Sequence, residues 1–345
     1  MEEWMDPPLD INQESAVMPL NQTLANGLEC DGFIYYPNLV PALYFLMFPI
    51  ALVLNGVAAW VSLHLKSTST FVVYLKNLVA ADVIMTLIIP INAASDLPTA
   101  SKLLFVLSCR FFSVIFYSTL YTCITLLGLI SLDRFFKIVA PRIKFGQNLT
   151  FSKLISGSVW VIMFGGTALP NIMFSNKSVG NLTKITSCMT LKEPAGLELH
   201  QRTVIYLNVL FWLVSVVIAV CYICITNKVI QSFRNSGSNN NQGKQKIKLR
   251  VFLVVVVFFV SFGPYHIVRI PYTFQQVNYV PTGCAYLKGR FTKELSLWFA
   301  TTNICMNPLL YVFLCREFKE KLVSMMKNVS LLCRVASAGK AEGTE

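Results

Sequence analysis

The chain has 345 residues, of which 54% are hydrophobic and 13% charged, and its mean hydropathy is +0.58. Soluble domains carry roughly a quarter of their residues as charged side chains, so this composition excludes an ordinary soluble protein and requires lipid as solvent. The net charge of +12 would suggest nucleic-acid binding in a soluble protein. Here it mostly reflects membrane topology, and no nucleic-acid partner is expected.

Seven apolar stretches are long enough to cross a bilayer, whose core about 30 Å thick requires about 20 apolar residues per helix. They are residues 38–65, 71–95, 106–138, 153–174, 202–228, 250–274 and 292–315. Their short connections predict an all-α membrane protein, a seven-transmembrane helix bundle over 38–315. An extracellular N-terminal tail, 1–37, precedes it, and a short amphipathic eighth helix with a cytoplasmic tail, 316–345, follows. Cys315 and Cys333 flank that amphipathic segment, where each could be acylated or remain an idle thiol.

The distribution of positive charge predicts the orientation of the bundle. Lys and Arg concentrate in the loops after the first, third and fifth spans and after the seventh, and cytoplasmic loops retain positive charge. We therefore expect a multi-pass plasma-membrane protein with its N-terminus outside. Three glycosylation sequons then fall on the outer side, at Asn21, Asn176 and Asn181, whereas those at Asn148 and Asn328 fall inside and should stay unmodified.

The outer loops and outer helix ends form a basic mouth in which basic residues outnumber acidic ones. A mouth of this sign attracts anions. Scattered loop charge explains many of these residues, but Arg269 and Lys293 each lie about one turn inside a span, where an ionisable side chain is costly and commonly functional. The sequence therefore predicts a small anionic extracellular ligand.

Four cysteines lie on the outer side and allow three pairings: Cys30, Cys109, Cys188 and Cys284. A bond between Cys109 and Cys188 would draw the long outer loop across the mouth of the bundle. Cys30 and Cys284 would then tie the N-terminal tail to the last outer loop.

Several polar residues inside the spans are expected to meet in a hydrated cluster, because each alone would be costly in lipid. They are Asn55, Asp82, Asn303 and Asn307. Simple helix packing is an alternative explanation for Asn55, but it is weaker for Asp82, whose carboxylate needs more than packing to justify its place in a membrane.

The cytoplasmic end of the third span carries Asp133 followed by Arg134. Adjacent opposite charges at a helix end are common, but their position at the end of the third of seven spans makes the signal strong. Prolines inside the last two spans remove backbone hydrogen bonds and bend their helices: Pro264, Pro271 and Pro308. Bent helices can pivot.

Five motifs stand at spacings typical of one receptor class: Asn55; Leu78-Val79-Ala80-Ala81-Asp82; Asp133-Arg134-Phe135; Trp160; and Asn307-Pro308-Leu309-Leu310-Tyr311. Together they resemble the rhodopsin-like G-protein-coupled receptors from end to end. Further runs resemble the purinergic receptors within that class: Tyr74-Leu75-Lys76-Asn77, Phe116-Tyr117, Gly128-Leu129-Ile130-Ser131-Leu132-Asp133-Arg134 and Pro264-Tyr265-His266-Ile267-Val268-Arg269-Ile270-Pro271-Tyr272-Thr273. Within the purinergic receptors, the chain resembles the subgroup that couples to inhibitory G proteins and responds to nucleoside diphosphates and nucleotide sugars. It also resembles the orphan relatives of that subgroup.

The resemblance implies a receptor for a nucleotide or nucleotide sugar with an inhibitory heterotrimeric G protein as partner. It implies activation and G-protein-coupling roles for Asn55, Asp82, Asp133, Arg134, Asn303, Asn307, Pro308 and Tyr311. It implies ligand contacts at Tyr117, Tyr121, Asn171, Lys192, His200, His266, Arg269, Tyr272, Gln276 and Lys293. No enzyme activity, cofactor or metal is expected, because three His and no metal-ligand or nucleophile–base grouping leave nothing to perform chemistry.

His266, Arg269 and Tyr272 are spaced by three residues, so we expect them to share one face of the sixth span. The sequence departs from the adenine-nucleotide members of the subgroup at Val204, where they carry Asn, and at Leu199, where they carry Trp. These departures leave room for a different ligand chemistry.

Two other functions compete with this interpretation. A receptor for an anionic lipid, such as a lysophospholipid, would use the same basic groups under a more apolar pocket. A transporter would show internal repeats and half-helices at the midplane of the membrane, and neither is visible in the sequence.

Overall fold

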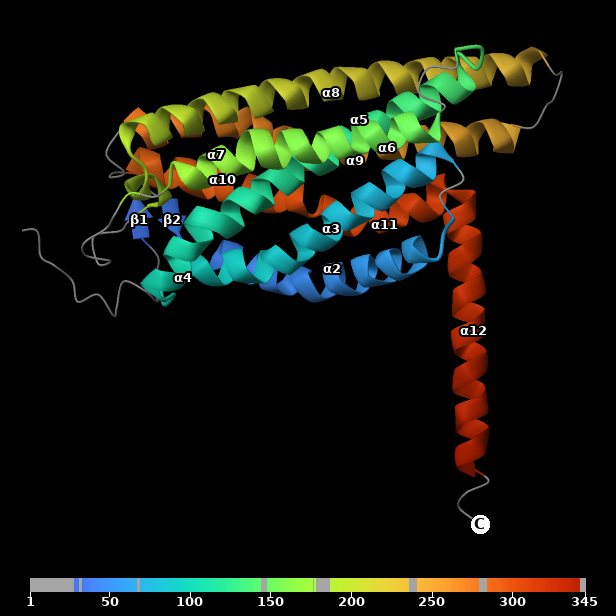
Figure 1. The fold of residues 1–345 in the computed structure, drawn as a ribbon, viewed down its shortest axis with the longest axis horizontal. Coiled ribbons are helices and arrows are strands. Elements are labelled where there is room, and N and C mark those ends of the chain that lie inside the picture. The colour runs from blue at the N-terminus through green and yellow to red at the C-terminus, as the bar shows by residue number, and fades with distance from the viewer. Residues whose placement is uncertain are drawn as a thin grey trace, which may run out of the picture.

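The computed structural model describes residues 28–30, 33–66, 69–143, 148–175, 177, 187–235, 241–278 and 284–341. The side chains of 28–35, of most of 241–253 and of 331–341 lie outside this description. The described chain forms long helices that run side by side, with a small β-hairpin at one end and one helix projecting from the other (Figure 1). We name these the hairpin end and the α12 end.

The elements follow one another as β1 (Leu28–Cys30), β2 (Phe33–Tyr35), α2 (Leu39–Leu63), α3 (Thr70–Ser95), α4 (Lys102–Leu107), η1 (Ser108–Phe112), α5 (Ser113–Ile138), α6 (Leu149–Trp160), η2 (Val161–Ala168), α7 (Leu169–Met173), η4 (Cys188–Leu191), α8 (Pro194–Asn235), α9 (Asn241–Asn278), α10 (Cys284–Thr301), α11 (Asn303–Leu314) and α12 (Arg316–Ala341). Here η1 and η2 are π-helical segments and η4 is a 3-10 turn.

Six described helical segments are long and apolar enough to cross a membrane: Leu39–Leu63, Thr70–Ser95, Lys102–Ile138, Leu149–Met173, Pro194–Asn235 and Val254–Val277. The segment Cys284–Phe313 reaches the same standard only when it is taken together with Arg316–Asn328, from which it bends by 94°. The charged residues of its first half, Lys288, Arg290, Lys293 and Glu294, and the polar Asn303 and Asn307 with Pro308 in its second half lower the hydropathy of this segment. The predicted seven-helix bundle followed by an amphipathic helix is the observed architecture.

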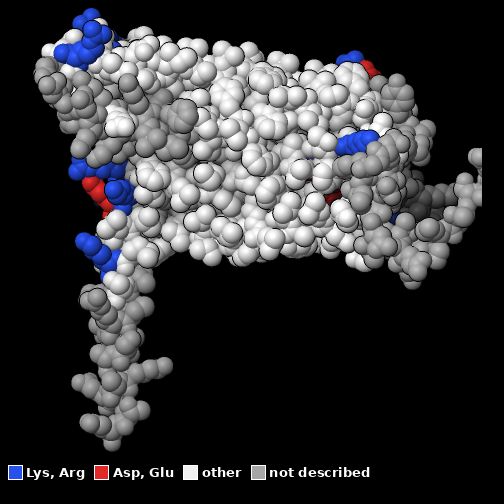
Figure 2. Space-filling model, turned by 180° about the vertical axis from the view of Figure 1, so that it is seen from behind, with Lys and Arg blue, Asp and Glu red and all other residues white. Residues whose placement is uncertain are grey.

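The long face of the bundle that Figure 2 shows carries almost no charge. In Figure 2, Lys, Arg, Asp and Glu atoms of the described residues gather near the two ends, and the surface between them is almost entirely uncharged. Large apolar side chains of the bundle helices are exposed, such as Leu46, Leu63 and Leu154. Hydrocarbon cannot solvate ionised groups. An uncharged, apolar surface of this kind is therefore suited to contact with lipid.

Several helices extend beyond the predicted spans. The helix α8 runs for 42 residues, and α10 begins at Cys284, eight residues before the predicted seventh span. Hydropathy detects only the part of a helix that lies in hydrocarbon, so polar ends that continue into water are missed. The hairpin was also not predicted, because three-residue strands that pair Leu28 with Tyr35 and Cys30 with Phe33 are too short to show an alternating pattern.

Contacts between helices depend on a few polar or small residues. The indole N–H of Trp160 in α6 donates to Asn77 Oδ1 in α3 at 3.0 Å. Gly128 in α5 allows α8 to approach closely, because a Cβ at this position would lie 2.9 Å from a Val214 methyl group. Small residues and interhelical hydrogen bonds are the usual means of association in lipid, where apolar surface alone provides little preference between a helix and the acyl chains.

We expect Asn77→Leu to destabilise the protein modestly, because it removes the acceptor of the Trp160 indole. Interhelical hydrogen bonds in membranes average about 0.6 kcal/mol and reach about 1.7 kcal/mol, so the apparent Tm of the detergent-solubilised protein should fall by about 1–3 °C. Ser158→Ala is the matched control, since Ser158 Oγ donates only to Leu154 O of its own helix and is exposed. Equal Tm values for Asn77→Leu and the wild type would contradict the assigned role.

Candidate ligand-binding site

A cavity of about 190 Å³ lies at the hairpin end of the bundle, among residues contributed by α2, α3, α5, α7, α8, α9 and α10. Eight of the ten residues predicted to contact a ligand line it: Tyr117, Tyr121, Asn171, Lys192, His200, Arg269, Gln276 and Lys293. Five different elements and the loop before α8 supply these side chains. The bundle thus brings together residues that are far apart in the sequence.

Two of the cations in this cavity lie against aromatic rings. The Arg269 guanidinium is 5% exposed, and its Cζ lies 5.4 Å from the centre of the Tyr117 ring. The Lys293 ammonium lies 5.8 Å from the centre of the Tyr272 ring. A cation is attracted to the face of an aromatic ring, but this attraction replaces only part of its lost hydration. The arrangement therefore favours a bound anion.

A disulfide holds the loop that closes this cavity. Cys109 in η1 bonds to Cys188 at the start of η4, with their Cα atoms 5.3 Å apart, as predicted. Cys284 is also disulfide-bonded, but the side chain of its predicted partner, Cys30, lies outside the described residues. Four other predicted modification sites lie outside the described residues or side chains: Asn21, Asn176, Asn181 and Cys333.

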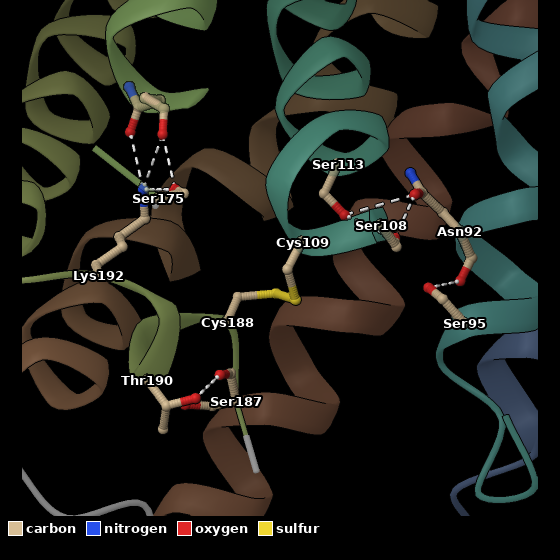
Figure 3. The surroundings of a disulfide bond; sticks show 11 residues. Asn92, Ser95, Ser108, Cys109, Ser113, Ser175, Ser187, Cys188, Thr190 and Lys192 are labelled. Atoms are coloured by element: carbon tan, nitrogen blue, oxygen red, sulfur yellow. Dashed lines mark hydrogen bonds between the residues drawn. A yellow bond between two sulfur atoms is a disulfide. The ribbon is translucent and has the colours of Figure 1, made fainter. Parts of the chain in front are cut away.

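Lys192, four residues after Cys188, is buried and lines the cavity. Figure 3 shows its side chain next to Ser175. Its ammonium donates to Ser175 Oγ at 2.7 Å and approaches Asn171 O at 3.4 Å and Asn171 Oδ1 at 3.5 Å. These acceptors are all neutral oxygens. Burial lowers the pKa of Lys192 to about 8, because a cation without an opposite charge is disfavoured away from water.

Of the three residues expected to share one face of α9, only Arg269 lines the cavity. His266 stacks on the Phe211 ring with a centroid distance of 3.6 Å, and Tyr272 stacks on Tyr286 at 6.0 Å. The expectation of a shared face is corrected by helix geometry: at 3.6 residues per turn, residues six apart point about 120° away from each other. A ligand contact by either residue stays a prediction.

Two carboxylates that no sequence pattern singled out, Asp96 and Glu294, also line the cavity. Glu294 pairs with Arg290 Nε at 2.7 Å, and Asp96 caps the end of α3. Their negative charge favours placing an anionic group toward the Arg269 side of the cavity.

Asn92 of α3 and Ser113 of α5 line the same cavity, and Ser108 of η1 lies next to them. Asn92 Oδ1 accepts hydrogen bonds from Ser108 Oγ at 2.8 Å and from Ser113 Oγ at 3.5 Å (Figure 3). Asn171 and Thr203 also line the cavity, and Asn171 Nδ2 donates to Thr203 Oγ1 at 3.3 Å. The neighbouring Val204 lines the cavity as well. Val204 is the departure noted in the sequence, so it lies where it can influence ligand choice.

Below the cavity, Asn55 joins three helices. Its Nδ2 lies 3.0 Å from Ala51 O, 3.2 Å from Thr86 Oγ1 and 3.1 Å from Ile304 O. Pro308 lies four residues after Ile304 and has no N–H to donate to that carbonyl. Asn55 therefore satisfies a backbone acceptor that the proline leaves open.

Asp82 is fully buried at the centre of the predicted polar cluster. Its carboxylate accepts from Asn307 Nδ2 at 3.0 and 3.1 Å, from the Tyr311 hydroxyl at 2.6 Å and from Cys123 Sγ at 3.5 Å. Asn303 Nδ2 in turn donates to Asn307 Oδ1 at 3.2 Å. The structure thus brings together the polar residues of α3 and α11 that the sequence grouped.

At the α12 end of α5, Asp133 and Arg134 have different partners. The Asp133 carboxylate pairs with Lys137 Nζ at 2.8 Å and also accepts a hydrogen bond from Thr70. The Arg134 guanidinium lies over the Phe71 ring, 4.0 Å from its centre. Both residues are therefore held against α3, at the end of the bundle opposite the cavity.

Residues 54–311 match a family described as the 7 transmembrane receptor (rhodopsin family). The chain is 44% identical to purinoceptor 13 of Homo sapiens over 287 residues, which cover 83% of this chain and 80% of that protein. It is 37% identical to purinoceptor 14 of Bos taurus over 287 residues, covering 83% and 84%. It is 38% identical to G-protein coupled receptor 87 of Mus musculus over 290 residues, covering 82% and 79%.

The position of the cations can be tested without a ligand. We expect Arg269→Cys and Lys293→Cys to react with a water-soluble, membrane-impermeant thiol reagent added at the hairpin side, because both side chains line the cavity. Ile267→Cys is the control, since Ile267 is 66% exposed on the apolar surface. If neither Arg269→Cys nor Lys293→Cys reacted while Ile267→Cys did, the assignment of which face of α9 points into the cavity would be wrong.

Proposed function

Because the chain belongs to the rhodopsin family of seven-transmembrane receptors, and within it to the purinoceptor type of G-protein-coupled receptor, we propose that its cavity binds an extracellular nucleotide or nucleotide sugar. The proposal rests on the placement of Arg269, Lys293 and Lys192 around one cavity that also contains aromatic rings. As a receptor, the chain is not an enzyme, and the family membership removes the transporter alternative.

The chemistry of the lining side chains supports a phosphate-bearing ligand. The planar guanidinium of Arg269 can grip a phosphate with two parallel hydrogen bonds, and Lys192 and Lys293 supply compact charges. Tyr117 and Tyr121 offer flat faces against which a base can stack. The cavity is smaller than the roughly 300–1,000 Å³ of typical ligand pockets, so binding would require side chains to move outward.

We place the hairpin end outside the cell and the α12 end in the cytoplasm. The Cys109–Cys188 disulfide at the hairpin end supports this orientation, because disulfides persist in oxidising compartments. The basic residues near the α12 end support it as well, since cytoplasmic segments retain positive charge. The N-terminus would then be extracellular and the receptor would lie in the plasma membrane.

Coupling of the two ends would use the two prolines of α9. Pro264 and Pro271 interrupt its backbone hydrogen bonds, and Asn208 of α8 donates to His266 O at 2.8 Å between them. In the active state, the α12 end of α9 would lie further outward. A ligand that binds this state more tightly than the inactive state shifts the population toward it, to an extent set by the difference between the two affinities. Arg134 would then meet an inhibitory heterotrimeric G protein at the α12 end.

An agonist screen tests the ligand class. Cells expressing the chain are exposed to nucleoside diphosphates, nucleotide sugars and lysophospholipids, and cyclic AMP is measured with and without pertussis toxin, which blocks inhibitory G proteins. We expect nucleotide-type ligands to lower cyclic AMP in a toxin-sensitive manner. A response to lysophospholipid alone would replace the proposed ligand with an anionic lipid, and a toxin-resistant response would overturn the G-protein assignment.

Removal of a cavity cation should weaken the response to an anionic agonist. We expect Arg269→Ala and Lys293→Ala each to lower agonist affinity by roughly 10- to 100-fold, because hydrogen bonds to charged groups contribute about 1.5–3 kcal/mol. Radioligand binding checks this at matched surface expression. Lys288→Ala is the control, since Lys288 carries the same charge at the same end of α10 but does not line the cavity. Unchanged binding in both cavity variants would sink the phosphate-site proposal.

The lowered pKa of Lys192 predicts a pH dependence. The ammonium is charged below about pH 8 and neutral above it, so anion affinity should fall by up to about tenfold per pH unit above that value. The titration belongs above about pH 7.5, where a terminal phosphate with a pKa near 6 is already ionised. Lys192→Arg keeps its charge and should flatten this profile. The same slope in both proteins would contradict a role for Lys192 in holding the anion.

A further inference from the structure

A second concave site lies at the α12 end, in the angle between α11 and α12. We call it the elbow groove. It has a volume of about 730 Å³. Its lining consists of the basic Arg316, Lys319 and Lys327, the acidic Glu320, and Val312, Phe313, Val323 and Ser324. None of the functional residues assigned above contributes to it, and it lies at the opposite end of the bundle from the ligand cavity.

The groove faces away from the helix bundle. The opposite face of α12 packs inward, where Phe318 and Met325 are buried against the core and the Phe318 ring meets Tyr311 at 5.7 Å. The axis of α12 is bent by 94° from the segment that ends at Phe313. In Figure 1 the helix accordingly projects at a right angle to the long axis of the bundle, so it runs parallel to the plane of the membrane.

Apolar and cationic side chains share the walls of the groove. Phe313 is 57% exposed and Val323 is 45% exposed, and both would contact acyl chains at the depth where α11 leaves the hydrocarbon. Arg316 pairs with Glu320 at 2.6 Å, whereas Lys319 and Lys327 form no ion pair with a carboxylate among the described residues. Figure 2 shows basic atoms gathered where α12 meets the bundle.

We propose that the elbow groove binds an anionic phospholipid of the cytoplasmic leaflet, with its headgroup phosphates at Lys319 and Lys327 and its acyl chains against Phe313 and Val323. The coincidence of an apolar wall, a net positive charge and a position at the membrane surface favours a lipid, because a free anion needs no apolar wall. The cytoplasmic leaflet also carries the anionic lipids that attract such basic residues. The inference depends on the proposed orientation but not on the ligand of the other site.

The test uses the full-length receptor, purified in a neutral detergent, and a fluorescent short-chain phosphatidylinositol bisphosphate as probe, with phosphatidylcholine as the uncharged comparison. We expect saturable binding of the anionic probe and no binding of phosphatidylcholine. Lys319→Gln with Lys327→Gln should weaken binding by roughly 25-fold, since one basic residue near an anionic surface contributes about fivefold. Lys321→Gln is the control, because Lys321 lies on the same helix but does not line the groove.

Two further measurements distinguish a lipid from a free phosphate-bearing anion as the ligand of the elbow groove. Phe313→Ala should weaken binding of the lipid but leave competition by soluble inositol trisphosphate unchanged. Competition by inositol trisphosphate at the affinity of the lipid itself would mean a free-anion site and would overturn the proposal. An equal loss in Lys321→Gln would mean nonspecific attraction and would also overturn it.

The proposal can be separated from a protein contact. If the double lysine variant kept its lipid affinity but lost G-protein coupling in neutral nanodiscs, the groove would be a protein-binding surface and the lipid assignment would fail. The variants change exposed side chains, so we expect their Tm to match that of the wild type. A failed agonist screen would leave the lipid-binding and Tm measurements valid, because neither uses the ligand of the hairpin end.

Discussion

The Ile304 carbonyl illustrates the constraint on which the whole bundle depends. Pro308 leaves this acceptor without its usual backbone donor, and Asn55 of another helix supplies one at 3.1 Å. In hydrocarbon no water is available for an unsatisfied backbone group, so every irregularity in a helix must be matched by a side chain from a neighbour. The same reasoning explains why Asp82 collects donors from Asn307 and Tyr311. Irregular positions therefore become the points where helices are joined.

Much of this architecture is readable from the sequence because lipid enforces simple patterns. Apolar length located the spans, and the cost of a polar group in a membrane singled out the residues around Asp82 as well as Arg269 and Lys293. The motif set then indicated the receptor class. Each of these signals depends only on which residues lie within a span or at its end, and this can be read from the sequence alone.

What the sequence did not reveal depends on rotation about helix axes. His266 and Arg269 are only three residues apart, yet one packs on Phe211 and the other lines the cavity. The π-helical segments Ser108–Phe112 and Val161–Ala168 change the phase of the residues that follow them, and no pattern in the sequence marks their positions. For the same reason the sequence did not predict that the carboxylates Asp96 and Glu294 line the cavity.

The thiol of Cys315 lies at the junction between the last membrane helix and α12. It is 4% exposed, and the Phe318 N–H donates to its sulfur at 3.4 Å. Attack on a thioester requires an accessible thiolate, and a thiol in apolar surroundings is inert. An acyltransferase would reach this sulfur only after the first turn of α12 had opened. Of the two cysteines that flank the helix, Cys315 would thus report detachment of α12 from the bundle and would not serve as a permanent anchor.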